Sequence, residues 1–384
     1  MKFTINTNDF KSAVKRLAIV AIKGTLPTTA AIQFDYDGKG MMMTTNNLQQ
    51  QRTIKINAVS VGDTPCKFTI DCIKMNKLLT CIRTDNIVIE YDGLDKCEVY
   101  IGTKITFDVV HDCYKFDDIS TNDAASVVFY NSALKDALNK VSWAVADKKE
   151  TRKAITGVAM YVDVESKTIT SVATNSKYLS IYKTLTPKIN IMKDTKDCVA
   201  IIPHEALKMI DSLDGTFTVV AITDKYMLMV CGEDVLTTKL IEGNFPNWKQ
   251  VVPEKTMYKY KTDTKHLIKE IKQVQKIVKT MEADTDIIQF TLNGCDVGML
   301  PLKYNYNTKS DETVDIEHNA KMWYVTTELT PETFTFKFKL DTILPILESF
   351  DNDVKFGINS ERSPFVFTGD DNYKVIGMPC VRYN

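Results

Sequence analysis

A stripe of five lysines is the part of the sequence with the clearest chemistry, because clustered lysines can bind a polyanion such as DNA. Intervals of four, three, four and three residues separate Lys265, Lys269, Lys272, Lys276 and Lys279. An apolar stripe with the same intervals begins two residues later and comprises Leu267, Ile271, Val274, Val278 and Met281. An offset of two residues is about 200° at 3.6 residues per turn. The segment is therefore predicted to be a helix with one core face and one basic face.

Basic residues also mark other predicted helices and the turns after them. They include Lys11, Lys15, Lys74, Lys148, Lys149 and Arg152. The sixth predicted helix differs, since it carries Asp341 and Glu348. The whole chain has 48 basic and 49 acidic residues, a net charge of −1, so any nucleic-acid site must be a local patch. Such a patch would bind phosphate without reading base sequence; alternatively, the lysines only solvate the helices of a scaffold protein.

No pattern in the sequence predicts catalysis, a metal site or a cofactor. The chain has no Walker A sequence, no GxGxxG and no HExxH. The segment His204-Glu205-Ala206-Leu207 resembles the start of HExxH but lacks the second histidine. The four histidines are far apart in the sequence. We therefore expect a protein that is not an enzyme.

A repeated strand–helix pattern divides the sequence into six units. Lys2-Phe3-Thr4-Ile5 recurs 65 residues later as Lys67-Phe68-Thr69-Ile70, and each copy precedes apolar residues spaced four and then three apart. Six such apolar triplets, each after a β-rich run, begin at Phe10, Met75, Leu134, Ala206, Leu267 and Ile343. The sixth helix contains Pro345, which a helix tolerates only near its first turn. Six units in 384 residues give about 64 residues each.

Each unit reads as β-α-β-β-β, which predicts an α+β fold with antiparallel sheets and few helices. Paired units give three similar domains, and loop-like sequence near residues 124 and 256 marks the breaks. The predicted domains are therefore 1–124, 125–256 and 257–384. Each would contain two helices and two small sheets.

Composition places the chain in a reducing cytoplasm. Nine cysteines occur without a CxxC pair, and the odd number argues against a disulfide framework or a zinc ribbon. No apolar run approaches the roughly 20 residues of a membrane span, and the first residues read as a strand and not as a signal peptide. We therefore expect no membrane partner.

Several segments together resemble the bacterial β sliding clamp family, which supplies the processivity subunit of the replicative DNA polymerase. These segments are Met1–Ile5, Gly24-Thr25-Leu26-Pro27, Val172-Ala173-Thr174-Asn175, Leu240–Pro246 and Ile376-Gly377-Met378-Pro379. The most specific one continues from Leu240 to Pro253. The resemblance spans the whole chain and suggests a diverged or phage-encoded member.

The resemblance implies a head-to-tail homodimer, a ring of six domains around duplex DNA with helices lining the hole and sheets outside. It implies a tether for the replicative DNA polymerase that an ATP-driven clamp loader opens, without catalysis or cofactors. The residues that it places against DNA are Lys23, Lys74, Lys104, Lys148, Lys149 and Arg152. His204 and Glu205 depart from it, since the family is often basic at those two positions.

The resemblance also implies a groove for partner peptides. By position, its residues are Ile155, Thr174, Ser176, Lys177, Tyr178, Leu179, Pro246, Gln250, Val251, Ile376, Met378, Pro379 and Cys380. The family usually has Gly-His-Arg where this chain has Ser176-Lys177-Tyr178, and a basic residue where it has Gln250. These departures leave the preferred peptide open. Alternatively, apolar members such as Ile155 and Leu179 are ordinary core residues.

Overall fold

The computed structural model of the chain describes residues 1–24, 26–60, 64–110, 116, 124–184, 189–191, 198–280, 285–293, 296–305, 310–313, 318–321, 333–369 and 372–380. Thr25 and Met281, which belong to patterns noted above, lie outside these residues. The chain forms two compact units. The first comprises Met1–Asp136, Met160–Thr168 and Leu185–Glu242, and the second comprises Ala137–Ala159, Ile169–Thr184 and Gly243–Asn384.

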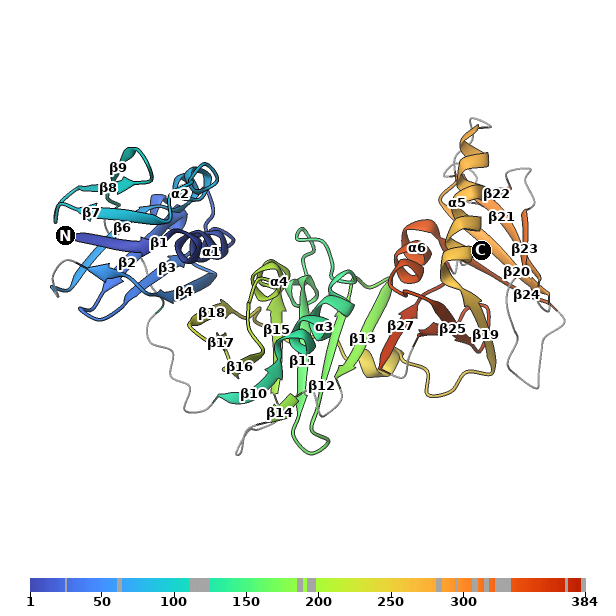
Figure 1. The fold of residues 1–384 in the computed structure, drawn as a ribbon. Helices are drawn as coiled ribbons and strands as arrows, with labels where there is room; N and C mark the ends of the chain where they lie inside the picture. The colour runs from blue at the N-terminus through green and yellow to red at the C-terminus, as the bar shows by residue number, and fades with distance from the viewer. Residues whose placement is uncertain are drawn as a thin grey trace. The chain divides into compact units, whose positions relative to one another are not determined.

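All six predicted strand–helix pairs are present, which confirms the repeat (Figure 1). The strands are β1 (Lys2–Asn6), β6 (Cys66–Asp71), β10 (Ala125–Tyr130), β15 (Cys198–Pro203), β19 (Tyr258–Asp263) and β24 (Phe334–Lys339). The helices that follow them are α1 (Thr7–Leu17), α2 (Cys72–Leu79), α3 (Asn131–Ser142), α4 (His204–Asp211), α5 (Thr264–Thr280) and α6 (Leu340–Glu348). No helix in these described ranges is long and apolar enough to cross a membrane.

Antiparallel sheets follow the helices, as predicted for an α+β fold. The first unit contains sheets in the orders β5-β1-β7-β8-β9 and β14-β10-β16-β17-β18-β4-β3-β2-β6. Their further strands are β2 (Ala31–Tyr36), β3 (Met41–Asn46), β4 (Gln50–Ile56), β5 (Val59–Ser60), β7 (Asn86–Tyr91), β8 (Lys96–Tyr100), β9 (Lys104–Asp108), β14 (Ile189–Ile191), β16 (Phe217–Ile222), β17 (Tyr226–Cys231) and β18 (Asp234–Lys239).

The second unit also contains antiparallel sheets, with strands in the orders β12-β13-β27-β26-β25-β19 and β22-β21-β20-β24, where β23 also pairs with β21. Their further strands are β12 (Thr168–Thr174), β13 (Tyr178–Thr184), β20 (Ile287–Asn293), β21 (Asp296–Asn305), β22 (Ser310–Thr313), β23 (His318–Lys321), β25 (Asp353–Ile358), β26 (Phe365–Thr368) and β27 (Tyr373–Gly377). Strand β11 (Gly157–Asp163) lies at the division between the units.

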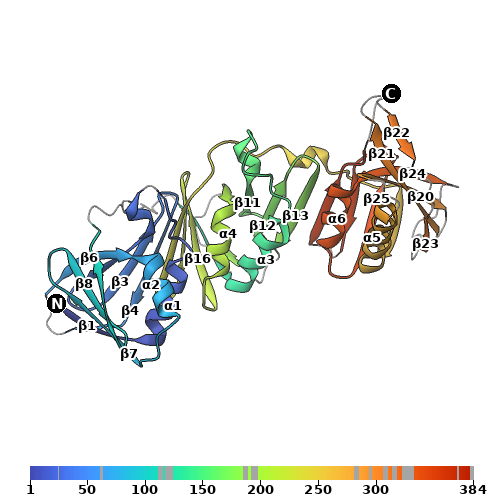
Figure 2. The same cartoon turned by 90° about the horizontal axis from the view of Figure 1, so that it is seen from above.

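Local sequence explains where the helices begin and which face they bury. The Asn6 side chain accepts hydrogen bonds from the backbone N–H groups of Asn8 and Asp9 and so caps α1, and the Asp71 carboxylate caps α2 through Lys74. Within the units, α1 packs against α2 and α5 packs against α6 (Figures 1 and 2). The apolar stripes face the sheets, so the predicted core positions Phe10 and Ile271 are fully buried.

The prediction for Pro345 was wrong. This proline is the sixth residue of α6 and lies in its interior, not in its first turn. Proline cannot donate the hydrogen bond that would continue the helix. Apolar packing offsets that loss, because Ile343, Ile346 and Leu347 on the same helix are all buried.

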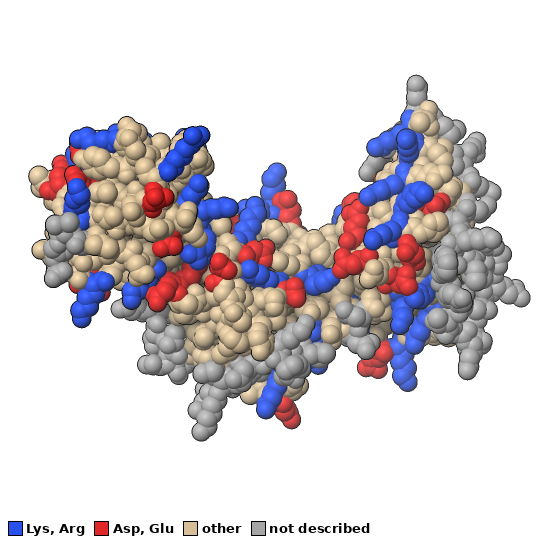
Figure 3. Space-filling model, in the orientation of Figure 1, with Lys and Arg blue, Asp and Glu red and all other residues tan. Residues whose placement is uncertain are grey.

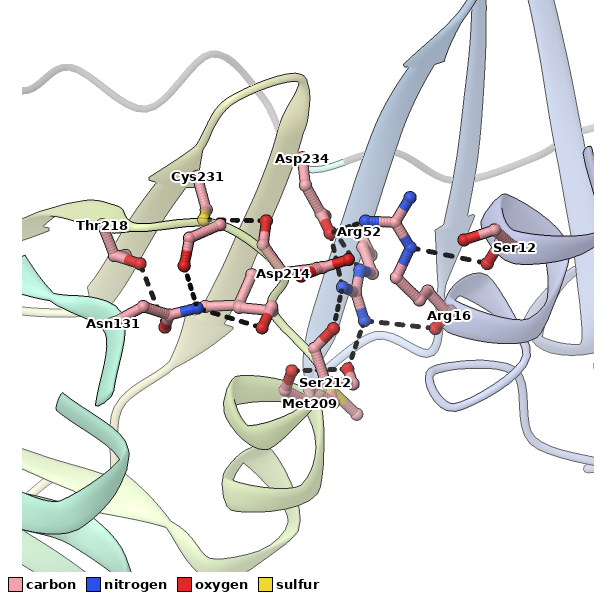
Figure 4. Close-up of polar contacts among 12 residues, drawn as sticks. Ser12, Arg16, Arg52, Asn131, Met209, Ser212, Asp214, Thr218, Cys231 and Asp234 are labelled. Atoms are coloured by element: carbon pink, nitrogen blue, oxygen red, sulfur yellow. Dashed lines mark hydrogen bonds and ion pairs between the residues drawn. The ribbon is translucent and has the colours of Figure 1, made fainter. Parts of the chain in front are cut away.

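Strands β4 and β18 join two segments of the first unit through a buried ionic network (Figure 4). The Arg52 side chain is fully buried, and its Nε and Nη2 donate to the two carboxylate oxygens of Asp234 at 2.9 and 2.5 Å. Its Nη1 donates to the Ser212 hydroxyl at 2.6 Å. Arg16 on α1 donates to the same Asp234 carboxylate at 3.0 Å. One buried carboxylate thus serves two guanidinium groups.

Strands β13 and β27 form a comparable junction in the second unit, but neutral aromatic side chains surround it. The Trp143 indole Nε1 donates to the Tyr373 hydroxyl at 2.9 Å and to the Lys140 carbonyl at 3.1 Å. The Ser180 hydroxyl donates to the Tyr373 hydroxyl at 3.3 Å. Burial raises the pKa of Tyr373, so the phenol is neutral at ordinary pH.

Candidate functional site

Helix α5 has the two faces that its sequence predicts. All five lysines of the stripe are exposed, whereas Leu267, Ile271, Val274 and Val278 are buried. Basic side chains therefore gather along the surface of α5 (Figure 3). Glu348 on α6 forms an ion pair with Lys272 at 2.7 Å. The helix presents a row of ammonium groups that can bind phosphates without reading bases.

Basic side chains of the first unit are also exposed on its helices. Lys11 and Lys15 lie on α1 on the side away from the buried Phe10 and Val14, and Lys23 lies in the loop that follows the helix. Lys74 is exposed on α2, and its ammonium nitrogen lies 4.8 Å from the centroid of the Phe107 ring. These positions leave the charged ends of the side chains in solvent, as phosphate binding requires.

Lys104 occupies a different setting, because it lies on the edge strand β9 and not on a helix. Its Nζ donates to Glu98 on the neighbouring strand at 2.8 Å. Hydrogen bonds from Lys104 and Tyr100 lower the pKa of Glu98, so the carboxylate stays charged. Lys104 therefore already has a counter-charge, and its contact with DNA stays a prediction.

The basic cluster after α3 links the two predicted sites of the second unit. Lys148, Lys149 and Arg152 are exposed in the turn before the 3-10 helix η2 (Lys153–Thr156). Hydrogen bonds from Arg152 lower the pKa of Glu150 to about 2. The Arg152 guanidinium also donates to the hydroxyl of Ser176 at 2.8 Å. A residue expected to face DNA thus contacts a residue expected to hold a partner peptide.

Several predicted groove residues meet where β13 pairs with β27. Leu179 stands directly opposite Ile376, and both are buried. The Met378 backbone N–H donates to the Lys177 carbonyl at 3.1 Å, which extends the pairing by one bond. The Met378 side chain is 42% exposed, so it can contact a bound chain. The buried members support the sheet, and Met378 is available for binding.

The turn between β12 and β13 is held by its own side chains. The Asn175 amide oxygen accepts from the backbone N–H groups of Lys177 and Tyr178, and the Thr174 hydroxyl donates to the Tyr178 carbonyl at 2.7 Å. Ser176 has a φ of 76°, in the left-handed region that favours glycine. Ser176 therefore occupies a backbone conformation that a glycine would adopt with less strain.

The remaining predicted groove residues lie on either side of that strand pair. Pro246, Gln250 and Val251 are exposed, in or just before the 3-10 helix η3 (Trp248–Val251), which lies near β13 in both ribbon views (Figures 1 and 2). The others are the buried Ile155 and Pro379, and Cys380, whose backbone N–H donates to the Lys337 carbonyl at 2.7 Å. Their joint use as one groove stays a prediction.

Sequence reasoning missed Trp143, which lies beside the predicted groove. Its ring centroid is 4.9 Å from that of Tyr178, and burial raises the pKa of Tyr178. The indole therefore supports the turn that carries Ser176 and Lys177. Position 143 belongs to no repeating pattern, but a tryptophan directly after a predicted amphipathic helix was a usable signal.

Comparison with known proteins finds similar sequences and the same fold. Residues 129–247 match the family described as DNA polymerase III beta subunit, central domain. The chain is 22% identical to the beta sliding clamp of Chlamydia muridarum over 99% of this chain and 98% of that protein. A Helicobacter pylori beta sliding clamp is 24% identical over 56% of each chain.

Solved structures match along the entire chain. The DNA polymerase III subunit beta from Pseudomonas aeruginosa has a TM-score of 0.83 at 18% identity, covering 99% of this chain and 100% of that one. The H. pylori beta clamp bound to a DNA ligase peptide has a TM-score of 0.81 at 18% identity, covering 100% of both chains. Along its whole length the chain is thus similar in sequence and fold to bacterial β sliding clamps, and its residues 129–247 match the family of their central domain.

Proposed function

We propose that the chain is a DNA sliding clamp, a non-enzymatic processivity factor that encircles duplex DNA. The observation that carries the proposal is a clamp fold along the whole chain in which α5 presents five exposed lysines opposite a buried apolar face. Phosphate contacts of this kind hold DNA without fixing the protein to one base sequence. Movement along the duplex requires that property.

Closure of a ring needs a second copy of the chain. We expect a head-to-tail homodimer in which the predicted domain 1–124 of one copy meets the predicted domain 257–384 of the other, with 125–256 between them. Helices of all domains would line the hole. The expected mass is about 87 kDa, twice the 43.5 kDa of one chain, and light scattering measures it.

The groove residues support a second part of the proposal, a site for partner peptides from the replicative DNA polymerase and the ATP-driven clamp loader. A related clamp from H. pylori has been solved with a DNA ligase peptide. The exposed thioether of Met378 suits such a site, because a flexible methionine adapts to varied apolar side chains. The complex would act in the cytoplasm, at the replication site.

Retention on DNA of different topology tests the function. A clamp assembled on a nicked circular plasmid should stay bound, and it should be lost when a restriction enzyme linearises the plasmid. The alternative is a non-catalytic scaffold protein without topological DNA binding. Equal retention on circular and linear DNA would favour a simple surface contact, and no retention on either would favour the scaffold.

A further inference from the structure

Acidic residues on α6 and just after it hold lysines from other elements of the second unit. Glu348 pairs with Lys272 of α5 at 2.7 Å, and Asp351 pairs with Lys140 of α3 at 3.1 Å. Asp341, at the start of α6, pairs with Lys177 at 2.6 Å. The helix therefore places negative charge directly beside the basic surface (Figure 3).

Lys272 differs from the other lysines of the basic face. Across the described part of the chain, Lys265, Lys269, Lys276 and Lys279 form no ion pair, whereas Lys272 is held by Glu348. The side chains of Lys272 and Glu348 are 54% and 49% exposed. An ion pair this exposed is weak and exchanges readily with other partners. A DNA phosphate must therefore compete with the Glu348 carboxylate to bind the Lys272 ammonium group.

The number of phosphates that a protein neutralises sets both its affinity for DNA and the dependence of that affinity on salt. Each additional lysine–phosphate contact makes the slope of log K against log salt steeper by about 0.9 for duplex DNA. A carboxylate beside a lysine removes such a contact and also repels the phosphate. Lower affinity per phosphate allows faster movement along the duplex.

We propose that α6 supplies a counter-charge to the basic face of α5, in which Glu348 competes with DNA phosphates for Lys272 and so lowers the affinity of the clamp for the duplex. The proposal rests on the proposed function, since it specifies how tightly the same surface binds DNA. It assigns a role to Glu348 of the sixth helix, an acidic residue beside the basic face of α5.

The test compares two substitutions that change the net charge equally. Glu348→Gln removes the partner of Lys272, and Glu90→Gln removes the partner of Lys2, which it meets at 2.8 Å on the strands β1 and β7. Binding of each full-length variant to a fluorescent duplex would be measured by anisotropy at several salt concentrations. Thermal unfolding of both variants checks that each retains the fold.

Glu348→Gln should steepen the salt slope by up to about 0.9, so that a fourfold rise in salt weakens its binding up to about 3.5-fold more than it weakens that of the wild type. Glu90→Gln should leave the slope unchanged. Adding Lys272→Gln to Glu348→Gln should return the salt slope to the wild-type value, because the ammonium group released from Glu348 is then missing.

Equal slopes for Glu348→Gln and Glu90→Gln would overturn the counter-charge role while leaving DNA binding intact. A steeper salt slope that persists after Lys272→Gln would also overturn the proposed role of Glu348. Failure of the wild type to stay on the nicked circular plasmid would instead overturn the proposed function.

Discussion

The junctions β4–β18 and β13–β27 use the same backbone pairing and opposite side-chain chemistry. Each aligns five residue pairs in an antiparallel register, and each lies within one unit. At the first, a fully buried arginine pairs with a buried carboxylate; at the second, a tryptophan, a tyrosine and a serine exchange neutral hydrogen bonds. Backbone pairing alone therefore does not determine how a junction is held.

Substitutions at the two junctions should lower the stability of the protein by different amounts. A buried ion pair is costly to desolvate, so its presence stabilises little relative to apolar residues, but removal of one partner leaves an uncompensated charge. A neutral hydrogen bond contributes modestly, and its loss costs correspondingly less. The ionic junction is consequently the more sensitive to single substitutions.

Asp234→Asn should have the largest effect. The change leaves the Arg52 guanidinium buried without its charge partner, which is expected to cost about 3–5 kcal/mol of unfolding free energy. Urea unfolding monitored by circular dichroism measures it. Glu233→Gln, which changes an exposed neighbouring acid, is the matched control and should be near neutral. A loss below about 1 kcal/mol would show that Arg52 does not depend on Asp234.

Replacement of both partners sharpens the comparison. Arg52→Met with Asp234→Leu should recover most of the stability lost in Asp234→Asn, because apolar residues of similar volume can replace a buried ion pair at little cost. The same unfolding measurement applies to the double variant. If the double variant is as unstable as Asp234→Asn, the network contributes more than the pairing of two charges, through Ser212 and Arg16.

Tyr373→Phe should have a smaller effect, about 1 kcal/mol of unfolding free energy. The Trp143 indole loses one acceptor but keeps the Lys140 carbonyl at 3.1 Å. Tyr258→Phe is the control, since its hydroxyl makes no hydrogen bond to the residues that the structure describes. Equal stability of the two variants would mean that the hydroxyl of Tyr373 does not stabilise the junction.

The smallest expected effect is on the pH dependence of the second junction. Burial raises the pKa of Tyr373, so its contribution is complete below the unfolded-state pKa near 10 and is lost as pH rises through the folded-state value. The stability difference between wild type and Tyr373→Phe should therefore shrink between pH 8 and pH 11. Thermal unfolding at the two pH values measures it, and a constant difference would contradict the burial of the phenol.

Local sequence patterns predicted most of the fold, but they did not predict the side-chain contacts between distant segments that stabilise it. The four-and-three spacing identified the helices and the buried face of α5, because such spacing depends only on residues one turn apart. Arg52 and Asp234 are 182 residues apart, and Trp143 and Tyr373 are 230 apart. No local period connects such pairs. The interior position of Pro345 was likewise set by the packing of its neighbours and not by propensity.

The separation between β4 and β18 has a consequence during synthesis of the chain. At 5–20 residues per second, the ribosome needs roughly 10–40 s to add the 182 residues from Arg52 to Asp234. Throughout that interval β4 is the open edge of the sheet β4-β3-β2-β6. A charged side chain on an open edge discourages pairing with another nascent chain. Until Asp234 is synthesised, Arg52 therefore leaves a charge without its carboxylate partner on that edge.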